Sequence, residues 1–224
     1  MGKGSTTKDS ILDAAEALFS EHGIEGVSLR SLTRRAGVNL AAVHYHFGSK
    51  EEVVKAVFLR RVRPLNSERI ELLDRAERRG APRLEDILTA LFAPAIRLAA
   101  DPDHGRRFMR LGARFYSEPA KYLASVFESE FSEVIRRFDS ALHRALPALP
   151  RQALRNRTHF AIGVMVHTML NSDRLRNWTG CACGPANAER TLDAMVRFVS
   201  AGMRSPEPPD AALAREPADR ECHQ

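Results

Sequence analysis

The chain has few cysteines and no long apolar run. Only three of its 224 residues are cysteine, and two of those lie in the short segment Cys181-Ala-Cys183. Three thiols make no disulfide framework, so a reducing compartment is expected. No stretch approaches the roughly 18 uninterrupted apolar residues of a membrane span, and the N-terminus has no apolar run that could act as a signal peptide. These absences argue against a disulfide scaffold and predict a soluble, cytoplasmic protein with no membrane partner.

Sequence patterns that support catalysis are missing as well. The chain has no glycine-rich loop for a phosphate, no histidine-rich metal pattern and no paired-carboxylate pattern. Cys181 and Cys183, with His167 or His223, could bind a soft metal, but a Cys-x-Cys loop without a further ligand set is usually only a loop. We therefore predict no metal, no cofactor and no enzymatic activity. The alternative is that the protein is an enzyme that carries a helical N-terminal head.

Acidic residues are absent from one basic stretch. Lys and Arg total 34 against 28 for Asp and Glu, which gives a net charge of +6 and favours an anionic partner. From Ser28 to Lys50 the charged residues are Arg30, Arg34, Arg35 and Lys50 itself. A solvated basic face would explain this charge equally well, so the pattern of the neighbouring residues decides between the two interpretations.

The same stretch predicts two short helices around a tight turn. Apolar residues recur at helical spacing on both sides of Gly37, whose permissive backbone suits a turn. Ser28 and Asn39 are suitable N-caps for the two helices. The inward-facing residues are Leu29, Leu32 and Ala36 in the first helix and Val43 and Phe47 in the second.

An amphipathic helix precedes this pair and ends at Gly23. Its apolar stripe consists of Ile11, Ala15, Leu18 and His22, with Leu12 and Phe19 alongside. Residues 1–50 are therefore predicted to form a three-helix head. We expect Phe19, Leu32, Val43 and Phe47 to pack at its centre.

The remaining sequence predicts helices separated by turn residues, with no strand pattern. Ser49-Lys-Glu-Glu52 has the form of a capping box, so a helix begins after Gly48; Pro64 is expected to kink or end it before it resumes over 65–79. Further helices are expected over 84–99, with an interruption at Pro94, and over 104–117, 119–146, 151–176 and 186–203. The buried stripe of the helix over 119–146 is expected to be Leu123, Phe127, Phe131, Val134, Ile135 and Phe138.

The predicted fold is all-α, with about nine helices in total. A helix-turn-helix DNA-binding domain over 1–50 is followed by an effector-binding and dimerisation domain over 51–205. Residues 206–224 are rich in Pro, Ala, Glu and Arg, cannot bury enough apolar surface to fold, and are expected to form a disordered tail.

The turn at Gly37, the cap at Asn39, the basic segment and the ending Tyr45-His46-Phe47-Gly48-Ser49-Lys50 occur together. Over about residues 8–60 this sequence resembles the TetR family of transcriptional regulators. The resemblance implies that the third helix enters the major groove of double-stranded DNA and that the start of the fourth contacts phosphate. A hydroxyl, an imidazole and an ammonium at a helix N-terminus are suitable phosphate partners.

The resemblance assigns base contacts to Leu40, Ala41, Ala42 and His44, with Arg30 reaching the same groove, and backbone contacts to Tyr45, His46 and Lys50. With the two caps, the predicted DNA-binding set is Ser28, Arg30, Asn39, Leu40, Ala41, Ala42, His44, Tyr45, His46 and Lys50. His44 stands where a tyrosine is more usual, and the Leu40-Ala41-Ala42 side chains offer no hydrogen bonds. Sequence selectivity would then depend on methyl contacts to thymine and on DNA shape.

One recognition helix binds weakly, so two heads are expected on a palindromic operator, with half-site centres about 34 Å or a multiple of it apart. The family resemblance implies a homodimer held by a four-helix bundle from the last two helices. Plain core packing is the alternative for these residues. The predicted interface residues are Phe160, Val164, His167, Met195, Phe198 and Val199.

The resemblance also implies a cavity for a small apolar or amphipathic effector, with a filled core as the alternative. Its apolar wall would be Phe92, Ile96, Phe108, Met109, Phe115, Phe127 and Phe131. Its possible polar anchors are His159, Arg110, Arg114 and Tyr116. The segment Arg60-Arg-Val-Arg-Pro-Leu-Asn66 resembles a subgroup that includes regulators of fatty-acid metabolism, which makes an acyl ligand conceivable.

These expectations predict a ligand-responsive transcriptional repressor that binds its operator as a homodimer and is released by a small-molecule effector. The alternative is a constitutive DNA-binding regulator, or an activator, with a filled body and no effector.

Overall fold

A computed structural model describes residues 6–101, 105–117, 124–171 and 187–206, and these residues form nine helices and no strand. The all-α prediction is therefore confirmed. The helices are α1 (Thr7–His22), α2 (Leu29–Ala36), α3 (Leu40–Phe47), α4 (Lys50–Arg78), α5 (Leu84–Ala100), α6 (Gly105–Ser117), α7 (Ala124–Ala145), α8 (Arg151–Leu170) and α10 (Ala188–Arg204). No helix in these ranges is both long and apolar enough to cross a membrane.

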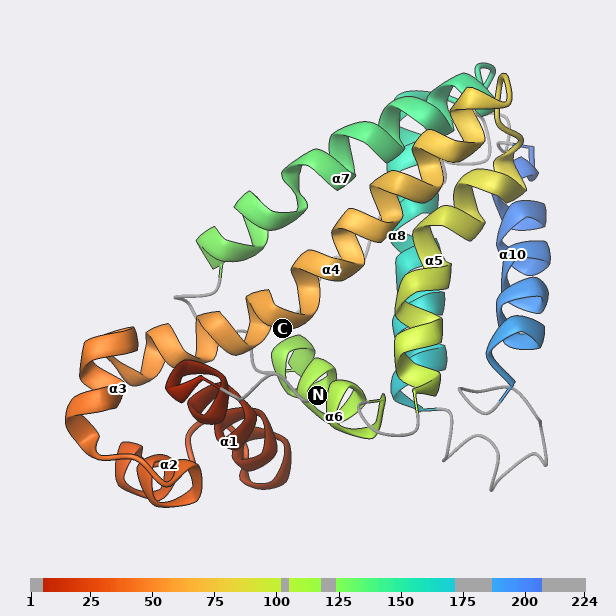
Figure 1. The fold of residues 1–224 in the computed structure, drawn as a ribbon. Coiled ribbons are helices and arrows are strands. Elements are labelled where there is room, and N and C mark those ends of the chain that lie inside the picture. Colours follow the sequence, from red (N-terminus) through yellow and green to blue (C-terminus); the bar gives the residue numbers. More distant parts are fainter. Residues whose placement is uncertain (1–5, 102–104, 118–123, 172–186, 207–224) are drawn as a thin grey trace, which may run out of the picture.

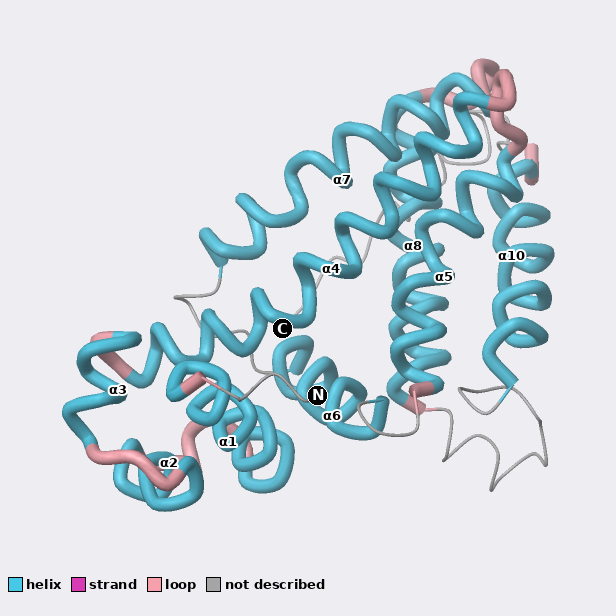
Figure 2. The backbone as a smooth tube through the Cα atoms, viewed as in Figure 1, coloured by secondary structure: helices cyan, strands magenta, loops and turns pink. Residues whose placement is uncertain are grey.

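The first three helices, which we call the head, form a group at one end of the molecule (Figure 1). The long helix α4 leaves the head and runs to the opposite end, with α7 beside it. The helices α5, α8 and α10 lie together away from the head, and we call α5 to α10 the body. Figure 2 shows that short loops connect the helices of the head and also α4 to α5.

The short helices of the head begin at side chains that cap them. Ser28 Oγ accepts a hydrogen bond from the backbone N–H of Ser31 at 3.1 Å, and Asn39 Oδ1 accepts one from Ala42 at 2.8 Å. Ser49 Oγ likewise accepts from the backbone N–H of Glu52 at 3.3 Å. These contacts satisfy N–H groups that have no partner inside the helix, so each helix starts where the sequence predicts.

Two hydrophobic clusters hold the molecule together. The body cluster is formed mainly by α5, α7, α8 and α10, with Leu73 of α4. The head cluster contains Phe19, Leu32 and Val43, which are fully buried, while Phe47 is only partly buried at its edge. The head cluster also takes in Val53 to Val62 of α4 and two residues of α6, Leu111 and Phe115. Both α4 and α6 therefore join the body to the head.

Helix α4 does not end at Pro64, in contrast to one of the two outcomes that the sequence predicts. The whole helix is 29 residues long, and Pro64 is exposed inside it. A buried polar network fixes the next turn: Asn66 Nδ2 donates to the Glu130 carbonyl of α7 at 2.7 Å, and Arg69 Nε donates to the Leu91 carbonyl of α5 at 2.9 Å. These contacts hold α4 against α5 and α7 just after the proline, whose missing N–H leaves one helical hydrogen bond unmade. Helix α5 likewise continues through Pro94, which is buried.

The structure corrects several other details. Helix α8 ends at Leu170, not at residue 176, and Asn171 follows as its C-cap. Ile135 was expected in the buried stripe of α7 but is 63% exposed, and His22 lies on the exposed surface of α1. Residues 119–123, including Leu123, and residues 172–186 lie outside the described ranges, as does the predicted tail from residue 207 onward.

Ion pairs join α5 to α10 at both ends. Arg204 Nη1 lies 2.5 Å from Glu85 Oε1, and Arg97 Nε lies 2.8 Å from Glu189 Oε1. The hydrogen bond from Arg204 lowers the pKa of Glu85 to about 2, so this carboxylate stays charged throughout the neutral range. The last helix is therefore fixed on α5 by charge as well as by its apolar face.

Candidate nucleic-acid interface

Helices α2 and α3 meet at a turn that needs glycine. Gly37 has φ 68° and ψ 30°, the left-handed conformation in which a side chain would be strained, and it caps the C-terminus of α2. Asn39 then begins α3 two residues later. This tight connection fixes the direction of α3 relative to α2, as a helix-turn-helix requires.

Helix α3 is fixed by one face and exposed on the other. Val43 is its buried residue, packed in the head cluster. Leu40 is 48% exposed and Tyr45 is 85% exposed, and Ala41, His44 and His46 are exposed as well. An uncovered tyrosine and leucine on a short helix at the tip of the molecule indicate a surface that another molecule covers.

A hydrogen bond fixes the ring of His44. Its Nδ1 lies 2.8 Å from the carbonyl oxygen of Gly48. A carbonyl can only accept a hydrogen bond, so Nδ1 carries the proton and Nε2 remains available on the other side of the ring. In the neutral imidazole Nε2 is an acceptor, which suits the amino group of adenine or cytosine in a major groove.

The junction of α3 and α4 gathers groups suited to phosphate. Tyr45 and His46 contact edge to face, with ring centroids 5.1 Å apart. Ser49 caps α4, and Lys50 is its first residue, so the ammonium lies beside the positive end of the helix dipole. This turn also carries two acids: Glu52 is paired with Lys55 at 2.6 Å, and Glu51 is exposed, with its pKa lowered by a hydrogen bond from the Ser49 side chain. This junction can hold an anion.

Positive charge on α2 is also available for a partner. Arg30, Arg34 and Arg35 are exposed, and none forms an ion pair with a carboxylate in the described part of the chain. Thr33 Oγ1 donates to the carbonyl of Arg30, not to its side chain. The whole predicted DNA-binding set thus lies on α2, α3 and the first turn of α4, with Ser28 and Asn39 committed to capping and Ala42 half-buried.

Some of the predicted subunit-interface residues are exposed, and others are buried inside the chain. Phe160 of α8 is 66% exposed and Phe198 of α10 is 70% exposed, while His167 is exposed and Val164 half-buried. Met195 and Val199 are instead buried in the body cluster of their own chain, because they lie on the face of α10 that packs on α5. Sequence reasoning missed Ile162, an apolar residue of α8 that is 41% exposed.

The predicted effector residues separate into two groups. Phe92 and Ile96 are buried in the body cluster, with Phe108 and Met109 packed against it. Phe115, Phe127 and Phe131 belong to the head cluster or pack against it. His159 is exposed next to Phe160, so it does not lie with either group. Arg110 is exposed, and the side chains of Arg114 and Tyr116 lie outside the described part of the structure.

Sequence reasoning also missed the residue at the centre of the second group. Phe58 of α4 contacts Phe115 with ring centroids 5.3 Å apart and Phe127 at 4.4 Å, and Phe127 stacks on Phe131 at 5.8 Å. Its position on the apolar side of α4, next to Val57, was the available signal. The four rings connect α4, α6 and α7.

The described residues contain no group of three or more His, Cys, Asp or Glu side chains that could hold a metal ion. His167 contacts Asn171, whose Nδ2 lies 3.3 Å from its Nδ1. Cys181, Cys183 and His223 lie outside the described ranges, so the structure does not test the alternative of a soft-metal site there.

Comparisons with known proteins agree with this architecture. Residues 11–57 match the family described as bacterial regulatory proteins, tetR family, and residues 89–202 match the tetracyclin repressor-like C-terminal domain. The HTH-type transcriptional regulator SrpR of Pseudomonas putida is 41% identical over 59 residues, which are 26% of this chain and 28% of that protein. The chain thus matches little more than a quarter of that relative's length.

Solved structures resemble nearly the whole chain. The complex of SmeT with triclosan has a TM-score of 0.65 and 25% identity, with 91% of this chain and 99% of that chain covered. The fatty acid degradation regulator FadR of Bacillus halodurans has the same fold, with a TM-score of 0.60 at 17% identity and coverage of 92% and 100%. Since the C-terminal match alone spans just over half of the sequence, the chain belongs to the TetR family of transcriptional regulators.

Proposed function

We propose that this protein is a repressor that binds a palindromic operator as a homodimer and is released by a small-molecule effector. The observation that carries the proposal is the outer face of α3. It is exposed around Leu40, His44 and Tyr45, and it adjoins the phosphate-compatible start of α4. A constitutive regulator without an effector is the second candidate, because the two hydrophobic clusters account for most of the predicted effector residues as ordinary core.

The proposed contacts fall into two classes. Tyr45, His46 and Lys50 hold phosphates and so set the register of α3 on the DNA. Leu40, Ala41, Ala42 and His44 face the base edges, with Arg30 reaching the same groove. Because only Arg30 and His44 among these are polar side chains, selectivity depends on two hydrogen-bonding groups, on methyl contacts and on DNA shape.

Lys50→Ala is expected to weaken binding to operator and to unrelated DNA alike. Each lysine that neutralises a phosphate releases a counterion, so its loss from both heads should reduce the slope of log affinity against log salt by about two. Tyr45→Phe removes only a hydroxyl and should lower affinity with the slope unchanged. Fluorescence anisotropy over a salt series measures both quantities.

Arg78→Ala is the matched control, since this exposed arginine lies at the far end of α4. It should alter neither the affinity nor the slope. Unchanged operator binding in the Lys50→Ala and Tyr45→Phe double variant would refute the proposed interface.

The proposed effector site lies among the rings that connect α4, α6 and α7. The rings of Phe58, Phe115, Phe127 and Phe131 would hold an apolar or aromatic molecule. The SmeT complex contains such a compound, triclosan, and SmeT is 25% identical to this chain. Helix α6 contributes Leu111 and Phe115 to the head cluster and also packs on α5 and α8, so a ligand beside it would shift the population of head positions.

Triclosan is expected to lower operator affinity, and operator is expected to lower triclosan affinity by the same factor, on the order of 5- to 150-fold. Phe131→Ala should weaken triclosan binding and leave operator binding in its absence nearly unchanged, because Phe131 lies on α7 and is only partly buried against the head cluster. Titration calorimetry measures the triclosan affinity of the free protein and of the protein–operator complex. Equal triclosan affinity in the two titrations, or no binding at all, would favour the constitutive regulator.

A further inference from the structure

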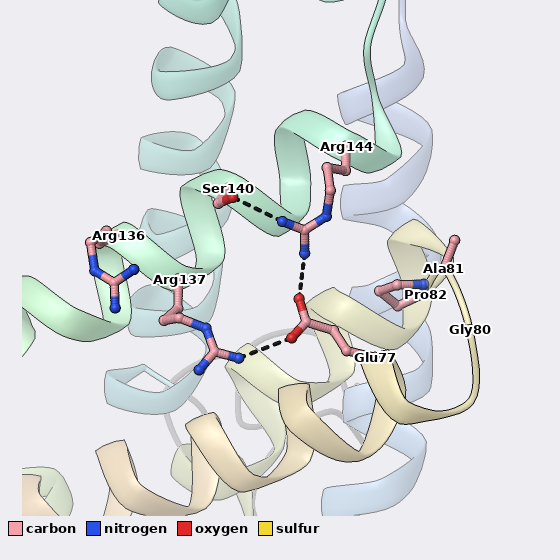
Figure 3. A pocket seen from close by; sticks show the side chains of 8 residues that line it. All are labelled: Glu77, Gly80, Ala81, Pro82, Arg136, Arg137, Ser140 and Arg144. Atoms are coloured by element: carbon pink, nitrogen blue, oxygen red, sulfur yellow. Dashed lines mark hydrogen bonds and ion pairs between the residues drawn. The ribbon is translucent and has the colours of Figure 1, made fainter.

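A hollow lies at the end of the body that is remote from α3. Glu77 at the end of α4, the loop from Gly80 to Pro82 and one face of α7 line this hollow of about 490 Å³, which is open to solvent (Figure 3). Its volume is sufficient for a small polar molecule. None of the residues predicted to bind DNA, an effector or a second subunit lines it.

The lining is strongly basic. Three arginines of α7, Arg136, Arg137 and Arg144, line the hollow together with a single carboxylate, that of Glu77. Figure 3 shows Arg137 and Arg144 directed at Glu77, with Arg136 apart from them. Asp74 lies just behind the wall and is bonded to Arg137. The lining itself therefore carries two positive charges in excess, and one excess charge remains when Asp74 is included.

The hydrogen bonds leave donors unused. Glu77 Oε2 accepts from Arg137 Nη2 at 2.9 Å, and Glu77 Oε1 accepts from Arg144 Nη2. Arg144 Nη1 donates to Ser140 Oγ at 2.9 Å. A guanidinium has five N–H donors, and among the described residues nothing accepts from Nε or Nη1 of Arg137. Figure 3 shows the side chains of Arg137 and Arg144 converging on Glu77.

A purely structural role explains only part of this arrangement. Glu77 bridges two arginines of α7, so it fastens the end of α4 to that helix. Such a bridge needs neither Arg136, which pairs with no carboxylate in the described ranges, nor a charge excess in a hollow. Guanidinium groups with free donors around a cavity are typical of an oxyanion site.

We propose that this cavity binds a small phosphate monoester. The phosphate group carries a charge of about −1.5 to −2 at neutral pH, and the positive charge of the lining, which still exceeds the negative by one when Asp74 is included, attracts it. Its oxygens accept from Arg136, from the unused edge of Arg137 and from Arg144, while Glu77 holds the last two in place. Pro82 and Gly80 offer an uncharged wall for the organic part. The site is independent of the operator and effector proposals.

Titration calorimetry on the full chain tests this proposal with glycerol 3-phosphate, inorganic phosphate and succinate, each at matched ionic strength in sodium chloride. Glycerol 3-phosphate is expected to bind one site per chain, with succinate much weaker. Tighter binding of glycerol 3-phosphate than of inorganic phosphate assigns the site to an organic phosphate, and equal binding assigns it to free phosphate. Absence of saturable binding by both phosphates, or tighter binding of succinate, would overturn the proposal.

Variants locate the binding site. Arg136→Ala changes an exposed side chain without an ion pair in the described structure, so folding should be retained while phosphate affinity falls about fivefold or more. Arg75→Ala removes one exposed charge from α4 outside the cavity and should bind as the unmodified protein does. If Arg136→Ala behaves like Arg75→Ala, the cavity is not the site.

Discussion

Arg61→Met is expected to destabilise the folded protein by about 3–5 kcal/mol, because it leaves a buried carboxylate without its counter-charge. The side chain of Glu16 in α1 is only 2% exposed, and Arg61 of α4 is its partner. Arg61 Nε lies 3.0 Å from Glu16 Oε1 and 3.1 Å from Oε2, and Arg61 Nη2 lies 2.5 Å from Oε1. This fork of charged hydrogen bonds connects α1 to α4, next to the more exposed ion pair of Arg60 with Asp13.

The neighbouring Arg63 provides a matched comparison. It forms the same kind of fork with Glu130 of α7, at 2.8 to 3.2 Å, but its own side chain is 63% exposed, and Glu130 is 19% exposed against 2% for Glu16. Arg63→Met should therefore cost about 1 kcal/mol or less. Urea denaturation followed by circular dichroism gives both values. The double variant Glu16→Leu with Arg61→Met should recover most of the loss, since no buried charge remains. Equal losses for the two single variants would show that burial of Glu16 is unimportant.

Phe160→Glu combined with Phe198→Glu is expected to convert the protein to a monomer and to reduce operator affinity about 100-fold or more. Both rings are largely exposed in the single chain, on α8 and α10, and Ile162 extends the apolar surface of α8. Charges at these positions would be desolvated in an interface, which is unfavourable. A monomer binds only one half-site of the operator. In a dimer, the second head binds the other half-site at little additional cost in entropy, and the monomer loses this contribution.

Sedimentation velocity and operator binding measure the two expected effects. Ile135→Glu is the control, because Ile135 is similarly exposed at 63% but lies on α7. That variant should remain dimeric and bind operator normally. Thermal melts should show that the double variant is folded, since neither phenylalanine is part of the core. A dimer that survives both charges, or a monomer with full operator affinity, would contradict the proposed assembly.

The local features of the head could be predicted from the sequence because they depend on neighbouring residues. Ser28 and Asn39 cap helices through hydrogen bonds to N–H groups three residues away, and Gly37 supplies the left-handed turn by itself. The face of α3 follows in the same way, since Val43 is the residue that its helical period turns inward. The candidate DNA-binding surface is therefore mostly readable from about 25 consecutive residues.

The body was less predictable because packing between distant helices decides which side of each helix is buried. Met195 and Val199 look like Phe198 in the sequence, yet α5 covers the first two and leaves the third exposed. Ile135 is apolar but exposed for a similar reason: the period of α7 could be placed in more than one way on its neighbours. Phe58 and the α4–α7 cavity require helix contacts across 60 or more residues, which no local pattern contains.

Pro64 lies where α4 passes from the head cluster to the body cluster, so it affects how the helix bends between them. Its missing N–H leaves the carbonyl of Arg60 without the usual helical donor, and it lies between Val62, the last α4 residue of the head cluster, and Leu73 in the body cluster. The helix is therefore softest against bending near this turn. Residues 50–64 form an arm of roughly 22 Å, so a bend of about 5° would move the start of α4 by about 2 Å. A change too small to disturb the packing of the body can thus displace α3, which precedes α4 directly, by more than half the length of a hydrogen bond.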